Sequence, residues 1–363
     1  MRKVAVIGGG IFGCSCGIDL ARSGFEVIVF ERDSNILTGA STVNHLRHHY
    51  GFHYPRSRET VGEIKHARRS FESEYGDSLS ESFPDFYGVS NKNSKTSPKE
   101  FLDFCDSLRL PYKIEWPEER FMDRARIGVC IRTPEKVYDP DILRAMIFQK
   151  IRTLPLELRL GHKVWGGKIV GKRKILEVSA GERQGEEEFD YLVNATYSNF
   201  NRFNLWFGFP RKNLQYELVE LLELAIPCSP KIGLTIMDGE FSSLLPRGEK
   251  GTFTLGHVDA SILRRVSGSD IDPNDITSGQ KQSNRVEILR RGASDFPFLA
   301  EAIVLGSLYV TRVVKANVDS TDERPSEITE YGNQVYSIFG GKVITCFDIA
   351  KKLRRLIEKN ETN

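Results

Sequence analysis

Apolar and polar positions follow a pattern of alternating strands and helices at the two ends of this chain and a strand-rich pattern between them. Near the N-terminus the pattern predicts a strand at 3–7, a helix at 11–23 and a strand at 26–31, and 335–359 is typical of a strand, a glycine turn and a helix. Between these ends, apolar runs predict strands at 156–160, 163–169, 174–179, 189–196, 216–224, 232–237, 253–257 and 309–314. Strands that alternate with helices favour a parallel sheet, and the strand-rich middle favours an antiparallel one.

Local signals place further helices between the strands. Ser97-Pro98 and Asp139-Pro140 each combine a capping side chain with a proline suited to a first helical turn, and they predict helices at 98–108 and 141–151. The apolar residues expected to share one face of the second helix are Ile142, Leu143, Met146 and Ile147. Other expected elements are a polar helix, a polar loop and a mostly helical polar stretch, at 58–75, 88–97 and 259–295.

Composition limits the class of protein. The 363 residues carry 40% hydrophobic and 28% charged side chains and a net charge of +2, which is ordinary for a globular protein and suggests neither a nucleic-acid nor a membrane-surface partner. No apolar run approaches the ~20 residues of a membrane-spanning helix, so we expect a cytoplasmic protein. None of the six cysteines forms a C-x-x-C pair, and we expect reduced thiols in the core.

A glycine fingerprint follows the first predicted strand. In Gly8-x-Gly10-x-x-Gly13 the first glycine allows a tight turn, the second lets the backbone approach a pyrophosphate, and the third lets the helix pack on the strand. The helix N-terminus then directs free N–H groups at the phosphates. Glu31 ends the next strand, where its carboxylate can accept hydrogen bonds from a ribose diol. Strand, helix, second strand and acid together predict a dinucleotide site.

Three later segments resemble motifs of the D-amino-acid-oxidase-like flavoproteins, a superfamily that includes glycerol-3-phosphate dehydrogenase, 2-hydroxyglutarate oxidase and glycine/sarcosine oxidase. Gly39-Ala40-Ser41-Thr42 is similar to the family's G-[AT]-S-[ST] turn, which contacts the pyrophosphate and ribityl chain. Val193-Asn194-Ala195-Thr196 is similar to N-A-[TS]-G, although Tyr197 replaces the glycine. Phe339-Gly340-Gly341-Lys342-Val343-Ile344-Thr345 resembles the G-G-K-[IL]-T-T loop of glycerol-3-phosphate dehydrogenases, beside the flavin ring.

The resemblance implies FAD as the cofactor. Gly340-Gly341 would let the backbone approach the pyrimidine end of the flavin, where backbone donors, the dipole of the last helix and Lys342 would stabilise negative charge on the reduced ring. Val164 would contact adenine through its backbone. The expected FAD-binding residues are Gly8, Gly10, Ile11, Phe12, Gly13, Glu31, Arg32, Ala40, Ser41, Thr42, Asn44, Val164, Ala195, Thr196, Gly340, Gly341, Lys342, Val343 and Ile344.

The pattern and the resemblance together predict the fold class and the domains. We expect an α/β protein in which a Rossmann-like, FAD-binding parallel sheet of the glutathione-reductase type carries an inserted, mainly antiparallel β-sheet substrate domain. The FAD-binding domain is expected to be discontinuous, at 1–82, 137–205 and 325–363. The substrate-binding domain is expected at 83–136 and 206–324.

Four of the seven histidines lie between residues 44 and 57. His49-x-Gly51-x-x-Tyr54 resembles the H-x-G-x-x-Y of 2-hydroxyglutarate oxidases and glycerol-3-phosphate dehydrogenases. A neutral imidazole there could take the proton of a substrate hydroxyl while hydride leaves for flavin N5, so His49 is the first candidate base and His53 the second. Histidines that only pack or hydrogen-bond are the alternative. A covalent histidyl–flavin link is possible in the superfamily, but nothing in this sequence requires it.

Zinc is a second interpretation of the same cluster, His45, His48, His49 and His53. Pairs four residues apart could share one face of a helix and bind a metal together. However, no cysteine or carboxylate nearby completes a ligand set, and Gly51 and Pro55 argue against a regular helix. We therefore expect no metal.

Three arginines are candidates for holding a substrate anion, because a guanidinium binds carboxylate or phosphate bidentately. Arg324-Pro325 resembles the R-P step before the G-G-K loop of glycerol-3-phosphate dehydrogenases, which places Arg324 with the candidate catalytic residues. Arg47 and Arg56 are candidate substrate-binding residues. The other side chains expected to line the substrate pocket are Tyr54, Tyr216, His257 and Tyr309.

These features predict an FAD-dependent oxidoreductase that removes hydride from a CH–OH carbon of a small anionic substrate, such as a 2-hydroxy acid, a polyol phosphate or a sugar derivative. Oxygen or an electron carrier would reoxidise the flavin, and neither a nucleic-acid partner nor a membrane span is expected. An amine or amino-acid oxidase and a non-catalytic flavin-binding protein stay open as alternatives. A dehydrogenase that uses NAD fits less well, because such folds do not need the late Gly-Gly-Lys loop.

Overall fold

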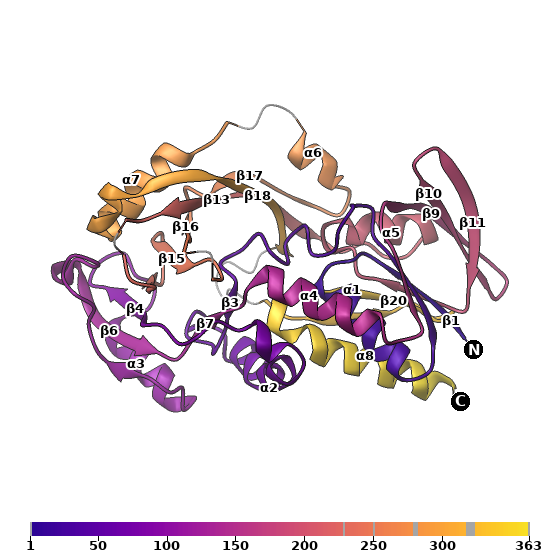
Figure 1. Ribbon diagram of the computed structural model, residues 1–363, viewed down its shortest axis with the longest axis horizontal. Helices are drawn as coiled ribbons and strands as arrows, with labels where there is room; N and C mark the ends of the chain where they lie inside the picture. Colours follow the sequence, from indigo (N-terminus) through magenta and orange to yellow (C-terminus); the bar gives the residue numbers. More distant parts are fainter. Residues whose placement is uncertain (1, 228, 250, 279–281, 317–323, 362–363) are drawn as a thin grey trace.

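The computed structural model describes residues 2–227, 229–249, 251–278, 282–316 and 324–361, and it extends along one long axis (Figure 1). The first strand, β1 (Lys3–Ile7), and the last helix, α8 (Cys346–Glu361), lie toward the same end. Strands β9 (His162–Val170), β10 (Arg173–Ala180) and β11 (Arg183–Phe189) project at that end, and β4 (Asp85–Ser90), β6 (Ile127–Thr133) and α3 (Pro98–Ser107) form the opposite one.

A six-stranded sheet is built around β1. Its strand order is β19-β20-β12-β1-β2-β8. On one side of β1 lie β12 (Tyr191–Asn194) and β20 (Val335–Phe339), and on the other β2 (Glu26–Phe30) and β8 (Leu156–Arg159), all parallel. β19 (Glu327–Glu330) runs antiparallel to β20 at the edge. The predicted parallel sheet is therefore confirmed.

Side chains of β1 alternate between two cores. Val4 and Val6 are fully buried in a core that contains residues of α1 (Ile11–Arg22) and α8, and Ala5 and Ile7 pack instead with residues of β10 and α5 (Phe200–Phe207). Both faces of the strand are thus covered, which explains why it reads as a continuous apolar run. Helix α2 (Arg58–Tyr75) packs on α8 next to α1.

A larger, mainly antiparallel sheet forms the second half of the molecule. Its strands follow the order β17-β13-β16-β15-β14-β4-β6-β5, and β18 (Ile303–Lys315) pairs with β13 (Leu214–Ala225) along almost its whole length. β4 and β14 (Gly233–Met237) are its parallel pair. The other elements are β3 (Arg47–His48), β5 (Lys113–Ile114), β7 (Lys136–Val137), β15 (Ser242–Pro246), β16 (Phe253–His257), β17 (Ile262–Gly268), α4 (Pro140–Ile151), α6 (Pro273–Thr277), α7 (Arg285–Asp295), η1 (Gly76–Ser78), η2 (Arg124–Arg126), η3 (Tyr197–Asn199), η4 (Pro297–Glu301) and η5 (Val343–Thr345).

Two segments form a different type of element from the one that the sequence predicts. Residues 88–90, expected in a loop, end the buried strand β4, and 262–268, expected to be helical, form β17. Gly88 interrupts the apolar pattern because the sulfur of Met122 would lie only 3.0 Å from any added Cβ. β17 is an edge strand whose Arg264 and Arg265 are exposed, so it lacks the apolar run of a buried strand. β11 and β15 were not recognised.

The predicted helix starts are confirmed, but the apolar face of α4 differs. Ser97 and Glu100 form a reciprocal capping box at α3, and the Asp139 carboxylate accepts hydrogen bonds from two backbone N–H groups at the start of α4. In α4, Leu143 and Ile147 are buried, whereas the side chain of Ile142 is 40% exposed. The buried face of this helix is therefore narrower than expected.

The thiols and the helices agree with two expectations from composition. Within the described ranges, Cys14, Cys16, Cys105, Cys130 and Cys346 are free and buried, and Cys228 lies outside those ranges. No helix in the described part of the chain is sufficiently long and apolar to cross a membrane.

Candidate active site

One cavity of about 450 Å³ runs along the carboxyl ends of the parallel strands. In open α/β sheets, ligands bind at this end of the strands. Most of the expected cofactor residues line it: Gly8, Gly10, Ile11, Phe12, Glu31, Arg32, Ala40, Ser41, Val164, Ala195, Thr196, Gly340, Gly341, Lys342 and Val343. Segments from both ends of the sequence therefore meet in one space.

The glycine fingerprint is required by close backbone packing. Gly8 has φ +109°, and a Cβ on it would lie 2.7 Å from the carbonyl oxygen of Ala195. A Cβ on Gly13 would lie 1.9 Å from the carbonyl oxygen of Gly8. Gly10, by contrast, lines the cavity as the N-cap of α1 and has no capping side chain of its own. The N–H of Ile11, the next residue, donates to the hydroxyl of Ser41 (3.0 Å), which also lines the cavity, so the cavity meets the start of this helix, where an anion is favoured.

Glu31 is held at the wall of the cavity by backbone donors. Its two carboxylate oxygens accept hydrogen bonds from the N–H of Gly9 (2.7 Å) and of Asp33 (2.9 Å). Burial raises the pKa of this carboxyl, and the two backbone hydrogen bonds oppose the rise. Each oxygen keeps a further lone pair, so the carboxylate can still accept hydrogen bonds from a diol.

Four expected cofactor residues support the cavity from behind. Gly13 packs under the glycine turn, and Ile344 is fully buried. Thr42 donates its hydroxyl to the carbonyl of Leu37, and Asn44 donates its amide to the carbonyl of Ala40 (2.8 Å). The structure therefore places Gly13, Thr42, Asn44 and Ile344 around the glycine and serine turns and outside the lining.

The C-terminal glycine loop closes the cavity at its other end. A Cβ on Gly340 would lie 2.4 Å from the ring of Phe12, and one on Gly341 would lie 1.9 Å from the carbonyl oxygen of Arg324. The N–H of Gly341 donates to the hydroxyl of Ser326 (3.0 Å). Neither position has room for a side chain, so the loop needs both glycines to bring its backbone to the cavity.

Lys342 lines the cavity directly after these glycines. Its ammonium lies 4.2 Å from the centroid of the Tyr54 ring. Among the residues that the structure describes, no carboxylate makes an ion pair with it. Burial, with a smaller effect of the Arg47 charge, lowers the pKa of Lys342 to about 7.

The two candidate bases meet beside Lys342. The rings of His49 and His53 lie 6.2 Å apart, and they are 5.5 and 5.4 Å from the ring of Tyr54. Burial and the charges of Lys342 and Arg47 hold the pKa of both imidazoles well below the usual range, so both are neutral at pH 7. The Nδ1 atom of each is buried and has no hydrogen-bond partner among the described residues. The structure thus brings His49, His53, Tyr54 and Lys342 together, although of these four residues only Lys342 lines the cavity.

Two of the three candidate arginines are engaged inside the protein. Buried Arg47 donates to the hydroxyls of Tyr87 (2.7 Å) and Thr235 (2.8 Å) and lies 3.4 Å from a Glu135 carboxylate oxygen. Arg56 pairs with Asp238 at 2.7 Å. Their charges are already matched by carboxylates, which argues against the anion-binding role expected from sequence. Arg324 adjoins the glycine loop through its backbone carbonyl.

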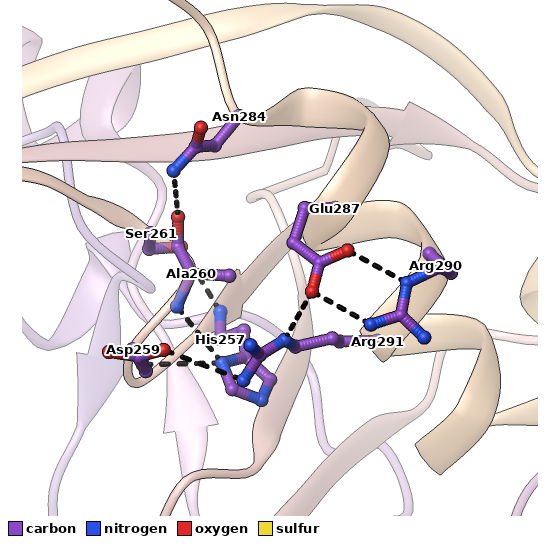
Figure 2. A network of polar contacts seen from close by, with 8 residues as sticks. All are labelled: His257, Asp259, Ala260, Ser261, Asn284, Glu287, Arg290 and Arg291. Atoms are coloured by element: carbon purple, nitrogen blue, oxygen red, sulfur yellow. Dashed lines mark hydrogen bonds and ion pairs between the residues drawn. The ribbon is translucent and has the colours of Figure 1, made fainter.

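Tyr216 and His257 lie outside the cavity. Tyr216 is fully buried in a core cluster, where burial raises the pKa of its hydroxyl to about 12. His257 belongs to a separate network (Figure 2), in which its Nδ1 accepts hydrogen bonds from the N–H groups of Asp259 (3.2 Å) and Ala260 (3.1 Å). The preceding residue, Gly256, faces His45, so strand alternation turns His257 the other way.

Several cavity residues were missed from sequence. They come from strand β9, from the η3–α5 segment, from α6 and from the paired strands β13 and β18, and include His162, Lys163, Trp165, Ser198, Asn199, Arg202, Trp206, Leu218, Asn274, Thr277, Val310 and Thr311. Tyr309, expected on a middle strand, does line the cavity. Tyr197, which replaces the family's glycine, also lines it and has φ +52°. Its hydroxyl bonds to both backbone groups of Val313, which stabilises this conformation.

The histidine cluster does not resemble a metal site in the described part of the chain. There, no group of three or more histidine, cysteine, aspartate or glutamate side chains is arranged to hold a metal ion. His45 bonds through Nδ1 to the hydroxyl of Thr254 (3.1 Å), and the imidazole of His48 lies 3.4 Å from Glu72 on α2. The members of the cluster therefore have separate surroundings.

Comparison with known proteins defines the class. The chain belongs to the family described as FAD dependent oxidoreductase, whose model matches residues 3–303. The fingerprint, the acid and the late glycine loop found around the cavity agree with this assignment. The protein is thus an FAD-dependent oxidoreductase with the D-amino-acid-oxidase-like fold.

The two sequence relatives are both named FAD-dependent monooxygenases, and the solved structures carry the names of other activities. The chain is 24% identical to the FAD-dependent monooxygenase FPY4 of Fusarium mangiferae, over 98% of this chain and 91% of the relative, and 24% identical to the FAD-dependent monooxygenase kojA of Aspergillus flavus, over 98% and 85%. Among solved structures it resembles glycine oxidase from Geobacillus kaustophilus, with a TM-score of 0.74 at 14% identity over 99% of this chain and 95% of that one. L-proline dehydrogenase from P. horikoshii also has a TM-score of 0.74, at 17% identity over 99% and 94%.

The cavity fits the cofactor of the family. It offers the start of helix α1 for a pyrophosphate, a carboxylate for a ribose and two glycines without room for side chains at the opposite end. Lys342 adds a positive charge beside these glycines, where the resemblance places the flavin ring. These groups would hold FAD.

Proposed function

We propose that this oxidoreductase converts a CH–OH carbon of a small, anionic substrate to a carbonyl, with His49 taking the hydroxyl proton. The observation that carries the proposal is the pair of neutral imidazoles with unpartnered Nδ1 atoms beside the flavin loop. A base for an alcohol must be neutral before the reaction, and both histidines meet this condition at pH 7. Bound FAD supplies a two-electron acceptor for the hydride that leaves the carbon.

In this proposal the hydroxyl proton of the substrate goes to a histidine, and the hydride goes to the flavin. The hydroxyl O–H bond breaks as the imidazole of His49 binds its proton, and the carbonyl forms as the C–H electron pair leaves with the hydride. His53 is the second candidate, because its ring shares the same burial and the same contact with Tyr54. The Nδ1 or Nε2 atom that accepts the proton must face the substrate, and Nδ1 has no other described partner.

Lys342 supports an anionic substrate. It is a cation without a described carboxylate partner, and it lines the cavity. A carboxylate or phosphate beside it would favour its charged form, which burial otherwise disfavours. Negative charge that develops on the reduced cofactor would be stabilised by the same ammonium, so the two roles are compatible.

The proposed division of the chain follows from where these groups lie. Residues 1–82, 137–205 and 325–363 would bind FAD and carry His49 and Lys342. Residues 83–136 and 206–324 would shape the substrate side, and their Leu218, Tyr309 and Thr311 line the cavity. Oxygen or an electron carrier would then take the electrons.

Amine oxidation is the second candidate function. Two of the solved structures that share this fold are named a glycine oxidase and an L-proline dehydrogenase, whose named substrates are amino acids. A neutral imidazole can also remove a proton from an ammonium group, so the site geometry permits this chemistry. In that case amines, and not hydroxy acids, would reduce the flavin.

Flavin bleaching without oxygen tests both functions. The FAD-loaded protein is mixed with hydroxy acids, polyol phosphates, sugar derivatives and amines, and the loss of visible absorbance is followed. We expect a hydroxy compound to bleach it and His49→Ala to slow bleaching by about 10²–10⁴-fold with FAD content unchanged, as for loss of a general base. His66→Ala, at an exposed histidine on α2, should bleach like wild type. An unchanged rate in His49→Ala would refute its role.

A further inference from the structure

Glu135 is a buried carboxylate that the proposed chemistry does not use. It lies in the turn between β6 and β7, and its side chain is 1% exposed. One carboxylate oxygen accepts the backbone N–H of Tyr50 at 2.6 Å. The other accepts the hydroxyl of Tyr87 at 2.6 Å and lies 3.4 Å from the Arg47 guanidinium. One carboxylate oxygen therefore holds the backbone just after His49. The other contacts Arg47, which lies just before His49, and Tyr87, which accepts a hydrogen bond from Arg47.

Apart from the bond to Glu135, few hydrogen bonds hold the backbone of the segment from Arg47 to Tyr50. β3 pairs with β7 through only two residue pairs, Arg47 with Val137 and His48 with Lys136. After His48 the ladder ends, and the next backbone group held is the Tyr50 N–H. In the chain, His49 therefore lies between the end of a two-pair ladder and the charge-assisted hydrogen bond from the Tyr50 N–H to Glu135.

We propose that Glu135 is a positioning residue, which holds the Arg47–Tyr50 turn and so places the His49 imidazole near Lys342. This inference rests on the proposed function of His49. A hydrogen bond from a backbone N–H to a carboxylate is stronger than one between neutral groups, which suits it to fix a turn without help from the ladder. The ion pair with Arg47 and the bond from Tyr87 hold the carboxylate itself in place.

The charge of Glu135 also balances Arg47 beside the site. Arg47 lowers the pKa of His49, His53 and Lys342, and its guanidinium is buried beside them. The acidic groups that face Arg47 are Glu135, Asp85 and the hydroxyl of Tyr87. The groups whose charges act on His49 and His53 are Arg47, Lys342, Arg324 and the neighbouring histidines. All are cationic or can become so, and a carboxylate at Glu135 offsets part of that charge.

A buried carboxylate can also serve stability alone, and the chain offers a matched control for that role. Asp85 on β4 is as buried as Glu135 and also lies near Arg47. Its carboxylate, however, accepts a hydrogen bond from the hydroxyl of Thr133 at 2.7 Å and not from the turn. Asp85→Asn thus perturbs a buried carboxylate of the same region while leaving the Tyr50 anchor intact.

Hydrogen exchange of the FAD-loaded protein tests the anchor without any substrate. Peptides that span residues 46–54 are followed by mass spectrometry in wild type, Glu135→Ala, Glu135→Gln and Asp85→Asn. We expect about tenfold or faster exchange in this segment for Glu135→Ala, because the Tyr50 N–H loses its acceptor. Glu135→Gln keeps an oxygen acceptor and should stay within about threefold of wild type, as should Asp85→Asn.

The reduction rate provides the second measurement. With a compound that bleaches the wild type, Glu135→Ala should be reduced about 10–100-fold more slowly at unchanged FAD content, and Glu135→Gln should recover most of the rate. If Glu135→Ala does not fold, Glu135→Asp replaces it, because its shorter side chain keeps the charge but withdraws the acceptor from Tyr50.

The outcomes separate this inference from the proposed function. Unchanged exchange at 46–54 in the Ala or Asp variant, exchange that rises evenly along the whole chain, or an equal rise in Asp85→Asn would overturn the inference. Faster exchange confined to 46–54 together with an unchanged reduction rate would overturn it as well. If no compound bleaches the wild type, the proposed function fails, and the exchange result still decides whether Glu135 holds the turn.

Discussion

At the scale of single residues, a carboxylate partner decides what each cation near the site can do. Arg47 and Arg56 each have such a partner, whereas Lys342 has none among the described residues. Gly8 and Gly13 could be recognised because a turn and a helix start require them locally. Arg47 and Arg56 were expected to hold a substrate anion, because a guanidinium binds a carboxylate or phosphate bidentately. Their carboxylate partners, Glu135 and Asp238, lie 88 and 182 residues away. A pattern along the chain does not contain such distant pairs.

Lys342 gives the first prediction at this scale, a pH dependence. Its pKa is lowered from 10.5 to about 7 by burial, so the ammonium is charged below pH 7 and loses its proton above it. If the charged form holds an anionic group, the rate of flavin reduction should fall as pH rises through about 7. Stopped-flow reduction from pH 6 to 9 measures this. Lys342→Met should lower the rate at pH 6 by about tenfold and flatten the profile, equivalent to one lost charge-assisted contact.

Lys342→Arg is the control for that profile. It keeps the charge across the whole range because a guanidinium does not lose its proton. Its profile should therefore lack the fall near pH 7 while the rate at pH 6 stays near that of wild type. A wild-type step that persists in Lys342→Met would assign the titration to another group.

At the scale of elements, local chemistry predicted helices better than edge strands. The capping residues Ser97 and Asp139 marked two helix starts because a cap and its proline are adjacent in sequence. β17 was missed because an edge strand with exposed arginines has no apolar run. β4 was missed for a different reason, since its pairing with β14 joins Asp85 to Gly233 across the chain. Strand partners of this kind are chosen by packing, which a local pattern does not report.

The join between β1 and α1 supplies the second prediction. Gly13→Ala would place a Cβ 1.9 Å from the Gly8 carbonyl oxygen, and backbone cannot yield as a flexible side chain can. We expect loss of FAD and destabilisation by about 2 kcal/mol or more, measured by bound flavin and by urea unfolding. Gly62→Ala on α2 is the matched control. Nothing lies within 4 Å of its Cβ, so the better helix propensity of alanine should stabilise the protein by up to about 1 kcal/mol.

At the scale of the whole molecule, the predicted α/β class is confirmed and the domain limits stay a prediction. Strand alternation with helices implied the parallel sheet, and the sheet does collect strands from 3–30, 156–194 and 327–339. The sequence did not reveal that the β3–β7 ribbon pairs residue 48 with residue 136, which belong to different proposed domains. That pairing places Glu135 of one proposed domain beside the histidine segment of the other.

The buried histidines of this molecule make its stability depend on pH. Burial lowers the pKa of five of the seven: His45, His48, His49, His53 and His257. The unfolded chain binds a proton on each near pH 6.5, and the folded protein does not. Each therefore contributes stability that is present above pH 6.5 and is lost as pH falls toward its folded pKa. Asp85 acts oppositely, because its pKa is raised to about 7 and the folded carboxyl keeps a proton that the unfolded one releases.

His48 isolates one such contribution. Its pKa in the folded protein is about 3, so between pH 6 and 4 it alone should add a slope of up to about 1.4 kcal/mol per pH unit to the free energy of unfolding. Urea unfolding at pH 7, 6 and 5 should show a shallower loss of stability in His48→Gln than in wild type. The exposed His66→Gln should follow the wild-type slope. Parallel curves for wild type and His48→Gln would mean that the folded protein accepts the proton on His48, and the neutral, buried state of the histidine segment would then be wrong.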